Sequence, residues 1–292
     1  MGMSRKKYAV FTMDVEAFSD TECVAKSESK VDVDLLDGFD EYMKILDKHN
    51  IKSTLFTVGT LAPQIADRLK KNLENGHRLA LHGHTHVAPM DVKKEIFRAE
   101  VGRAKKLLEE IFKTDVEGFR APFFSLDNAR LDILKELGFR YDSSRLNFSK
   151  ARHTVELDMK DFNRISRNLF HNDGFFEFGL SKGKVFGKRF PISGGGYVRI
   201  SNWTFMKTLI KMYLGKNDYY VFYLHPFELT RQEIPRIRGL KSYDRFYLKY
   251  GIEGYKKRIE KIISMLKKAG YEFVTFEELS ERLTEKSYSV ST

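Results

Sequence analysis

Several short stretches of the chain carry side chains that could bind a metal ion or transfer a proton, and a histidine cluster is the densest of them. His82, His84 and His86 lie within five residues, directly after the apolar run at residues 79–81. Neutral imidazole is a common metal ligand, and two histidines at short spacing can bind one side of a divalent ion. His82 and His86 need a turn to converge, which Gly83 permits. We expect these two to be ligands and His84 to be a pocket-wall residue.

Two carboxylates follow the first apolar run of the chain, residues 8–13. Asp14 and Glu16 are two positions apart, so on a strand they share a face. One of them can bind a metal ion while the other stays free as a base. Two histidines and one carboxylate leave coordination positions open, which is typical of a catalytic zinc site rather than of a closed structural one.

Two other classes of metalloenzyme fit this pattern less well. Non-haem iron oxygenases also use two histidines and one carboxylate, but there the carboxylate usually stands next to one histidine in the order His-x-Asp. Here the acid is remote and the histidines are neighbours. The H-E-x-x-H pattern of metalloproteases is excluded, because the glutamate is missing and Gly83 with Thr85 would make a poor helix.

Three further polar residues each follow a strand-like run. They are Arg120, Asp142 and His225, after the runs at 116–119, 139–141 and 219–224. In folds that alternate strands and helices, the chemistry collects at the carboxyl ends of parallel strands. We therefore expect all of these strand ends to face one mouth.

The elements that must position these residues alternate along the chain. Strands are expected at 8–13, 51–58, 78–81, 116–119, 139–141, 219–224 and 272–276. Amphipathic helices are expected at 34–50, 61–73, 91–112, 127–137 (with Asp127 as N-cap), 203–214, 252–268 and 277–283. This alternation indicates an α/β fold built on a parallel sheet or barrel.

A region of short β-like pieces interrupts the alternation at residues 154–200. It contains three successive glycines at 194–196, which lack the G-x-G-x-x-G spacing and instead predict a turn or a close approach of backbones. No repeat, low-complexity tract or linker is present. We expect one domain over residues 1–292 with a β-rich insertion at 154–200.

Composition is that of an ordinary globular protein, with 42% hydrophobic and 31% charged residues in 292. The sequence contains no run of 18 or more apolar residues, which a membrane-spanning helix would need, and no signal-peptide pattern is visible. The single cysteine, Cys23, excludes an intramolecular disulfide and fits a reducing compartment. These features predict a cytoplasmic location.

The net charge of +11 favours contact with phosphates, although lysines on solvated helix faces would explain much of it without a partner. Residues 231–250 mix basic with aromatic side chains, which suits a nucleic acid, a lipid headgroup or a sugar diphosphate. A pure nucleic-acid binder would leave the polar strand ends unexplained. We expect peripheral contact with an anionic membrane or a diphosphate-linked sugar, and no nucleic-acid partner.

The motifs appear in a fixed order, as Thr-Met-Asp-Val-Glu at 12–16, His-x-x-x-His at 82–86, Arg-Ala-Pro at 120–122, Tyr-Asp-Ser-Ser at 141–144 and Leu-His-Pro at 224–226. This set resembles the polysaccharide deacetylases with the NodB homology domain, carbohydrate esterase family 4. Gly-Gly-Gly-Tyr at 194–197, His-Pro-Phe-Glu-Leu at 225–229 and Pro-Arg-Ile at 235–237 make it most similar to the subgroup from exopolysaccharide and exosortase gene clusters.

Two departures from the family pattern stand out. The family has two consecutive aspartates in its first motif, where this chain has Asp14, Val15 and then Glu16. The tryptophan that is common after the fourth motif is replaced by Arg145. The first departure bears on the metal ligand and the second on the sugar-binding wall.

The resemblance implies a distorted (β/α) barrel and metal-dependent hydrolysis of an N-acetyl group on a saccharide. It implies that Asp14 is the base, oriented by Arg120, and that His225 is the acid, steadied by Asp142. Glu16, His82 and His86 would bind the metal, with zinc expected first and cobalt, manganese, nickel or iron as alternatives. Residues expected to contact the substrate are Pro122, Phe123, Tyr197 and Glu228, although Glu228 could instead be a buried partner.

Two rival functions use the same residues. One is an amidase or deformylase that acts on a small amide other than a saccharide, on the same metal site. The other is a catalytically inactive homologue that binds carbohydrate, which predicts that a motif residue has been lost. None of the motif residues is missing.

Overall fold

The central strand of the molecule is β1 (Lys7–Val15), which is buried along almost its whole length. In this computed structural model, which describes residues 6–27, 31, 33–146 and 156–289, β1 runs parallel to β11 (Tyr219–Leu224) on one side and β2 (Ser53–Thr57) on the other. The short β12 (Tyr271–Phe273) pairs with the first residues of β1. The strands β1, β2 and β11 are buried on both faces, which is the pattern of parallel strands covered from both sides.

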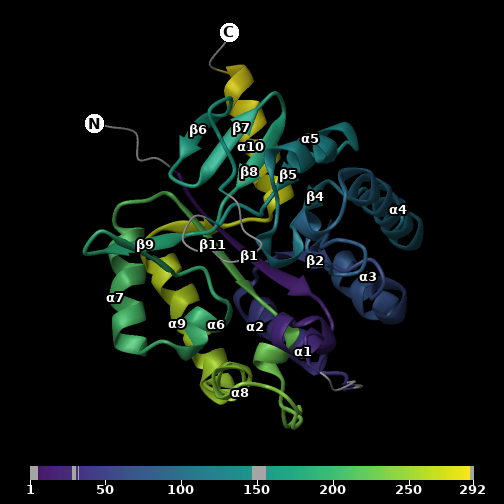
Figure 1. Ribbon diagram of the computed structural model, residues 1–292. Coiled ribbons are helices and arrows are strands. Elements are labelled where there is room, and N and C mark those ends of the chain that lie inside the picture. The colour runs from purple at the N-terminus through teal and green to yellow at the C-terminus, as the bar shows by residue number, and fades with distance from the viewer. Residues whose placement is uncertain (1–5, 28–30, 32, 147–155, 290–292) are drawn as a thin grey trace.

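The main sheet continues from β2 through β3 (Arg78–Leu81), β4 (Gly118–Phe119) and β5 (Tyr141–Asp142), all in parallel. Its strand order is β11-β1-β2-β3-β4-β5-β8-β7-β6. The sheet curls into a half-barrel, so the predicted α/β fold of the NodB type is confirmed (Figure 1). The carboxyl ends of β1, β3, β4, β5 and β11 therefore lie along one edge.

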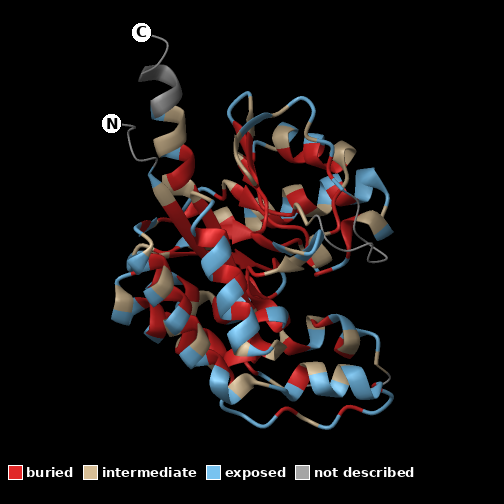
Figure 2. Cartoon of the chain, turned by 90° about the vertical axis from the view of Figure 1, so that its left-hand side faces the viewer, coloured by how far each residue is buried: buried red, intermediate tan, exposed pale blue. Residues whose placement is uncertain are grey.

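Amphipathic helices pack around this sheet, with their apolar sides inward (Figure 2). The long ones are α2 (Asp37–His49), α3 (Ala66–Glu74), α4 (Lys94–Phe112), α5 (Asn128–Glu136), α7 (Trp203–Leu214), α9 (Ile252–Lys268) and α10 (Phe276–Ser289). Asp127 caps α5 as predicted, by accepting a hydrogen bond from the Arg130 backbone N–H at 2.9 Å. None of the helices in the described residues is long and apolar enough to cross a membrane.

Short helical turns follow several strand ends and complete the cleft edge of the barrel. They are η1 (Phe18–Asp20), α1 (Glu22–Ala25), η2 (Ala62–Ile65), η3 (Pro89–Asp91), η4 (Pro122–Phe124), α6 (Gly195–Ile200), η5 (Pro226–Leu229) and α8 (Ser242–Lys249). The helix α6 corrects the prediction of β structure throughout 154–200, since its six residues are helical.

Part of the β-rich region at 154–200 belongs to the main sheet. Strands β6 (Asn163–Ser166), β7 (Leu169–Asn172) and β8 (Phe175–Phe178) extend the main sheet, and β8 runs parallel to β5. Strands β9 (Lys182–Val185) and β10 (Lys188–Pro191) form a hairpin of their own.

The glycine triplet marks a close approach of two backbones, as predicted. Gly194 bridges to Tyr223 in β11, and a Cβ atom on Gly194 would lie 2.0 Å from the Tyr223 carbonyl oxygen. Gly194 also has φ of 121°, which favours glycine. This contact places the start of α6 beside the carboxyl end of β11.

Candidate active site

The two predicted histidine ligands and Glu16 converge at the carboxyl ends of β1 and β3. Their ligand atoms all lie within 4.8 Å of one another. Glu16 Oε2 is 2.7 Å from His86 Nε2 and 3.7 Å from His82 Nε2. All three side chains are buried, so the chain has removed a carboxylate and two imidazoles from solvent at one point.

Local backbone structure sets the direction of each histidine. His82 Nδ1 donates a hydrogen bond to the Arg120 carbonyl oxygen at 2.8 Å, which leaves Nε2 directed at Glu16. Gly83 has φ of 76°, so the chain turns directly after β3 and brings His86 back toward the same point. The His86 ring packs edge-on against Phe123, with 4.8 Å between ring centroids.

The charges of this cluster fit a divalent cation. Burial alone would raise the pKa of Glu16, but the neighbouring His86, His225 and His82 hold it well below its ordinary value. Burial opposes protonation of His86, yet Glu16 raises the pKa of His86 overall. A buried carboxylate here thus recruits positive charge, and the donor set of two nitrogens and one oxygen would hold a metal ion with positions left open.

Asp14 lies beside this cluster and is bound by a buried arginine. Arg120 Nη1 donates to Asp14 Oδ1 at 2.5 Å and to Thr12 Oγ1 at 2.9 Å. Its Nε donates to the Ser143 carbonyl oxygen, and its guanidinium lies 4.0 Å from the centroid of the Phe56 ring. Arg120 is fully buried, so the position of Asp14 is fixed from behind.

His225 faces Asp14 from the end of β11. Its Nε2 lies 3.9 Å from Asp14 Oδ2, and its Nδ1 donates to Glu228 Oε2 at 3.2 Å. Burial opposes protonation of His225, but the carboxylates of Glu16, Glu228 and Asp14 raise its pKa to about 9. The imidazole is therefore positively charged at neutral pH.

Glu228 is the residue that contacts the Nδ1 side of His225, whereas the supporting role of Asp142 stays a prediction. Glu228 is fully buried, and Arg199 Nε donates to its Oε1 at 3.0 Å, so Glu228 is a buried partner and not a substrate contact. Asp142 accepts hydrogen bonds from the Ser144 backbone N–H and hydroxyl. Asp142 therefore supports the loop after β5. Among the described residues, no contact between Asp142 and His225 is found.

A second carboxyl group, missed in the sequence, lies beside Asp142. Glu177 on β8 is its strand partner, and both side chains are fully buried. Burial raises the pKa of both groups, and the Asp142 carboxylate pushes the pKa of Glu177 well above its ordinary value. Glu177 is therefore the protonated member of the pair. Only the pairing of β5 with β8 brings the two together.

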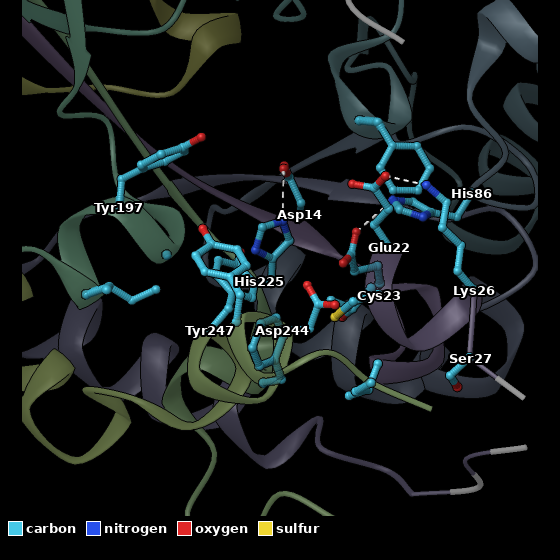
Figure 3. A pocket seen from close by; sticks show the side chains of 18 of the residues that line it. Asp14, Glu22, Cys23, Lys26, Ser27, His86, Tyr197, His225, Asp244 and Tyr247 are labelled. Carbon is cyan, nitrogen blue, oxygen red and sulfur yellow. Dashed lines mark hydrogen bonds and ion pairs between the residues drawn. The ribbon is translucent and has the colours of Figure 1, made fainter. Parts of the chain in front are cut away.

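The Glu16–His82–His86 cluster, Asp14 and His225 open onto a cleft of about 760 Å³. Figure 3 shows His225 pointing at Asp14, with Tyr197 and Tyr247 on one side of the cleft and Cys23 and His86 on the other. Phe123 and Tyr197, which are predicted to contact the substrate, line the cleft, and Tyr197 is half exposed. Pro122 is buried against Gly83, so its predicted substrate contact is not supported.

Two family models match the chain. Residues 31–141 match the polysaccharide deacetylase model, and residues 148–281 match a domain of unknown function (DUF3473). The first match contains His82, His86 and Arg120, and the second contains His225. Residues 31–141 are therefore similar to the polysaccharide deacetylase family, over well under half of the chain.

Curated relatives match part of this domain. A peptidoglycan deacetylase of Helicobacter pylori is 22% identical over 110 residues, which are 38% of this chain and 38% of that protein. Chitin deacetylase 1 of Cryptococcus neoformans is 25% identical over 117 residues, which are 40% of this chain and 25% of that protein. The chain thus matches well under half the length of either relative.

Solved structures share the fold over almost the whole chain. A Mycobacterium smegmatis protein described as a polysaccharide deacetylase has a TM-score of 0.58 at 15% identity, covering 98% of this chain and 94% of that one. A Bacillus anthracis protein described as a pseudoenzyme of carbohydrate esterase family 4 has a TM-score of 0.52 at 13% identity, covering 96% and 67%. Since the Bacillus anthracis protein is described as a pseudoenzyme, the shared fold does not by itself establish catalytic activity, which depends on the residues of the site.

Proposed function

We propose that this protein is a metal-dependent hydrolase that removes an N-acetyl group from an amino sugar. One observation carries the proposal: Glu16, His82 and His86 converge beside an Asp14–His225 pair in a single cleft. The named deacetylases among its relatives support the same reaction. The saccharide would be part of a glycan, or would be linked to a lipid or a nucleotide.

The reaction needs help at two points, because an amide is a poor electrophile and an amine is a poor leaving group. A divalent ion bound by Glu16, His82 and His86 supplies Lewis acidity for the acetyl carbonyl and for a water molecule. We propose zinc, with cobalt, manganese, nickel or iron as alternatives. The proton transfers fall to residues of the chain.

Asp14 is proposed to take the proton from the attacking water. Its Oδ1 is occupied by Arg120, and its side chain lines the cleft within 3.9 Å of His225. A base must be positioned within hydrogen-bond reach of the water, and the buried Arg120 supplies that positioning. Glu16 follows the last residue of β1, and both Asp14 and Glu16 line the cleft, so we propose that the base and the metal ligand reach the same water.

His225 is proposed to give a proton to the leaving nitrogen. The acid has to be protonated before that step, and the carboxylates of Glu228 and Asp14 beside His225 favour its protonated form by raising its pKa. Because Nδ1 donates to Glu228, the other nitrogen, Nε2, is the one that faces the cleft. Glu228 in turn is held by Arg199, so the imidazole has one orientation.

The finer predictions on substrate and location stay proposals. Aromatic walls at Phe123 and Tyr197 suit the apolar face of a sugar ring, and Lys26 and Lys241 in the same lining suit an anionic carrier such as a diphosphate. Membership of the exopolysaccharide subgroup, a role in polysaccharide biosynthesis and a cytoplasmic location are proposed on the sequence pattern alone.

The test is metal content together with acetate release. The purified chain would be loaded with zinc or cobalt and given N-acetylated glycans, lipid-linked sugars, nucleotide sugars and small amides. We expect acetate from at least one saccharide and none after chelation. Metal binding with no acetate from any saccharide would favour the inactive binding protein, and acetate or formate only from small amides would favour the amidase.

A further inference from the structure

One stretch of the chain differs sharply from the rest in charge. Residues 178–217 contain no aspartate or glutamate, although the whole chain has 40 acidic residues. The same stretch contains eight lysines and arginines, namely Lys182, Lys184, Lys188, Arg189, Arg199, Lys207, Lys211 and Lys216. It forms the β9–β10 hairpin, α6 and α7.

The tip of the hairpin exposes an aromatic ring that the fold does not use. Phe186 is 99% exposed, and it occupies the first position of a two-residue turn with φ of 45°, followed by Gly187 with φ of 79°. Such a turn prefers Asn-Gly, because positive φ disfavours a bulky side chain. Phe186 is therefore unfavourable both for the turn and for solubility, and its flanking residues Lys184 and Lys188 are also exposed.

The hairpin and α7 form one surface. Phe190 of β10 contacts Phe205 of α7 edge-on, with 5.6 Å between ring centroids. Along α7, the apolar side chains Phe205 and Met212 are 41% and 51% exposed, and the exposed Lys207 and Lys211 lie between them in the chain. We call this surface the hairpin–α7 face. It lies on the left of Figure 1, the side that Figure 2 turns toward the viewer.

A groove of about 320 Å³ between α7 and α9 adds to the positive charge of this face. It is lined by four lysines, Lys207, Lys211, Lys261 and Lys268, together with Trp203, Ser264 and Met265. Lys261 lies 5.5 Å from the centroid of the Trp203 ring. A tryptophan among lysines is the combination that lies at the headgroup level of a bilayer.

We propose that the hairpin–α7 face docks this protein on an anionic lipid bilayer, with Phe186 inserted among the lipids and the lysines on the headgroup phosphates. Exposed apolar side chains ringed by cations fit a bilayer, which offers apolar and anionic groups at one depth. A single-stranded nucleic acid would satisfy the lysines and would stack a base on Phe186, but it would leave the aliphatic Met212 without an apolar partner.

The basic-aromatic segment at 231–250 fits a bilayer less well than this face. Arg231 is already paired with Glu41 at 2.7 Å, and the segment contains the acids Glu233 and Asp244. Its rings Tyr243 and Tyr247 line the cleft. The helix α6, by contrast, lies between the hairpin and α7 in the chain and contributes its own residues to the cleft wall, so docking would bring the cleft beside the lipid surface.

The test is co-sedimentation of the whole chain with vesicles of phosphatidylcholine, with and without about 30% phosphatidylglycerol. We expect binding to the anionic vesicles at least about tenfold stronger than to the neutral ones, and loss of that binding at about 0.5 M salt. Equal binding to both, or binding to neither, would overturn the proposal. Binding of a single-stranded oligonucleotide in place of the vesicles would overturn it as well.

Two variants and two controls locate the surface. Phe186→Asn creates the preferred turn sequence, so the fold is not weakened, and about a tenfold loss of vesicle binding is expected. Lys207→Glu with Lys211→Glu should reduce binding more strongly.

The controls are Ile96→Ser on α4 and Lys70→Glu with Lys71→Glu on α3, all exposed and away from the face. Equal losses in the controls would contradict the assignment. None of these residues lines the cleft, so failure here and failure of the proposed activity are distinguishable.

Discussion

Three buried carboxylates surround the cleft, and they differ in what balances their charge. Asp14 is bound by Arg120 at 2.5 Å, and Glu228 by Arg199 at 3.0 Å. Glu16 is equally buried, but its contacts are the two imidazoles of His82 and His86. Asp14 and Glu228 are therefore each paired with a permanently charged arginine. Glu16 is paired only with histidines, which lose their positive charge when they are deprotonated.

This difference indicates that Glu16 is the carboxylate that would bind a metal ion. A buried charge without a partner costs several kcal/mol, so a fold keeps one only where something compensates it. Arginine provides this compensation at all pH values, whereas a histidine does so only when it is protonated. Binding of a divalent cation would stabilise Glu16 and leave both histidines neutral, as metal ligands must be.

The largest effect is expected from Glu16→Gln. Loss of the ligand charge should remove the bound metal and reduce acetate release by at least about a thousandfold. The metal-free variant should unfold at the same or a higher temperature than the metal-free parent, since an uncompensated buried charge is gone. Metal analysis and thermal unfolding check both parts. Glu22→Gln, at an exposed carboxylate in the same cleft, is the control, and a similar loss of metal there would break the comparison.

Asp14→Asn should separate catalysis from metal binding. We expect activity to fall by about a hundredfold to a thousandfold while metal content is unchanged, because the base is lost and the ligands remain. The variant should also be destabilised by about 3 kcal/mol, since Arg120 is left buried without its partner. Urea unfolding measures this cost. A variant that retains full activity would exclude Asp14 as the base.

Glu228→Gln should have a smaller effect, of about tenfold on kcat, and should lower the pKa of His225. The matched variant is Asp142→Asn, which removes a charge of the same sign that does not contact His225. NMR titration of the imidazole distinguishes the two. If Asp142→Asn shifted the pKa of His225 and Glu228→Gln did not, Asp142 and not Glu228 would be the carboxylate that steadies His225.

Stability of the metal-free protein should depend on pH through His225. Its folded pKa of about 9 is above the ordinary value of 6.5, so the folded state binds the proton more tightly. The contribution is fully present below pH 6.5 and is lost as pH rises through about 9. His225→Gln should flatten this part of the curve. Metal binding beside Glu16 should lower the pKa of His225, because Glu16 contributes most to raising it.

The smallest effect on activity, less than about threefold, is expected from Glu177→Gln. The amide replaces a carboxyl group that is already neutral, so its hydrogen bonding to Asp142 is preserved. Since the raised pKa of Glu177 costs stability above the ordinary carboxyl pKa, the variant should be more stable at pH 8 by about 1 kcal/mol. Chemical unfolding at pH 5 and pH 8 checks the sign, and equal stability of the two proteins at pH 8 would contradict a neutral Glu177.

Much of the fold could be predicted because its elements have local signals. The predicted bounds of α7, α9 and β11 match the structure at both ends, and Asp127 caps its helix as expected. The short strands β4 and β5 were placed within a few residues. Residues 154–200 were predicted in less detail, because residues 195–200 form the helix α6 and the pairing of β8 with β5 has no local signal.

The candidate site divides in the same way. Residue types at strand ends predicted that Glu16, His82, His86, Asp14 and His225 would meet, because parallel strands end at one edge. The partner of Glu228 was not predictable, since Arg199 is 29 residues away from it in the chain and belongs to a helix that was expected to be β. Glu177 was missed because only the pairing of β8 with β5 brings it beside Asp142.

The sequence by itself determined which side chains reach the cleft, since strand-end position follows from local pattern and the sheet is parallel. Tertiary structure alone decided which charge compensates which. Compensation depends on distances of a few ångströms between segments far apart in the chain, because electrostatic energy in a buried site rises steeply as groups approach.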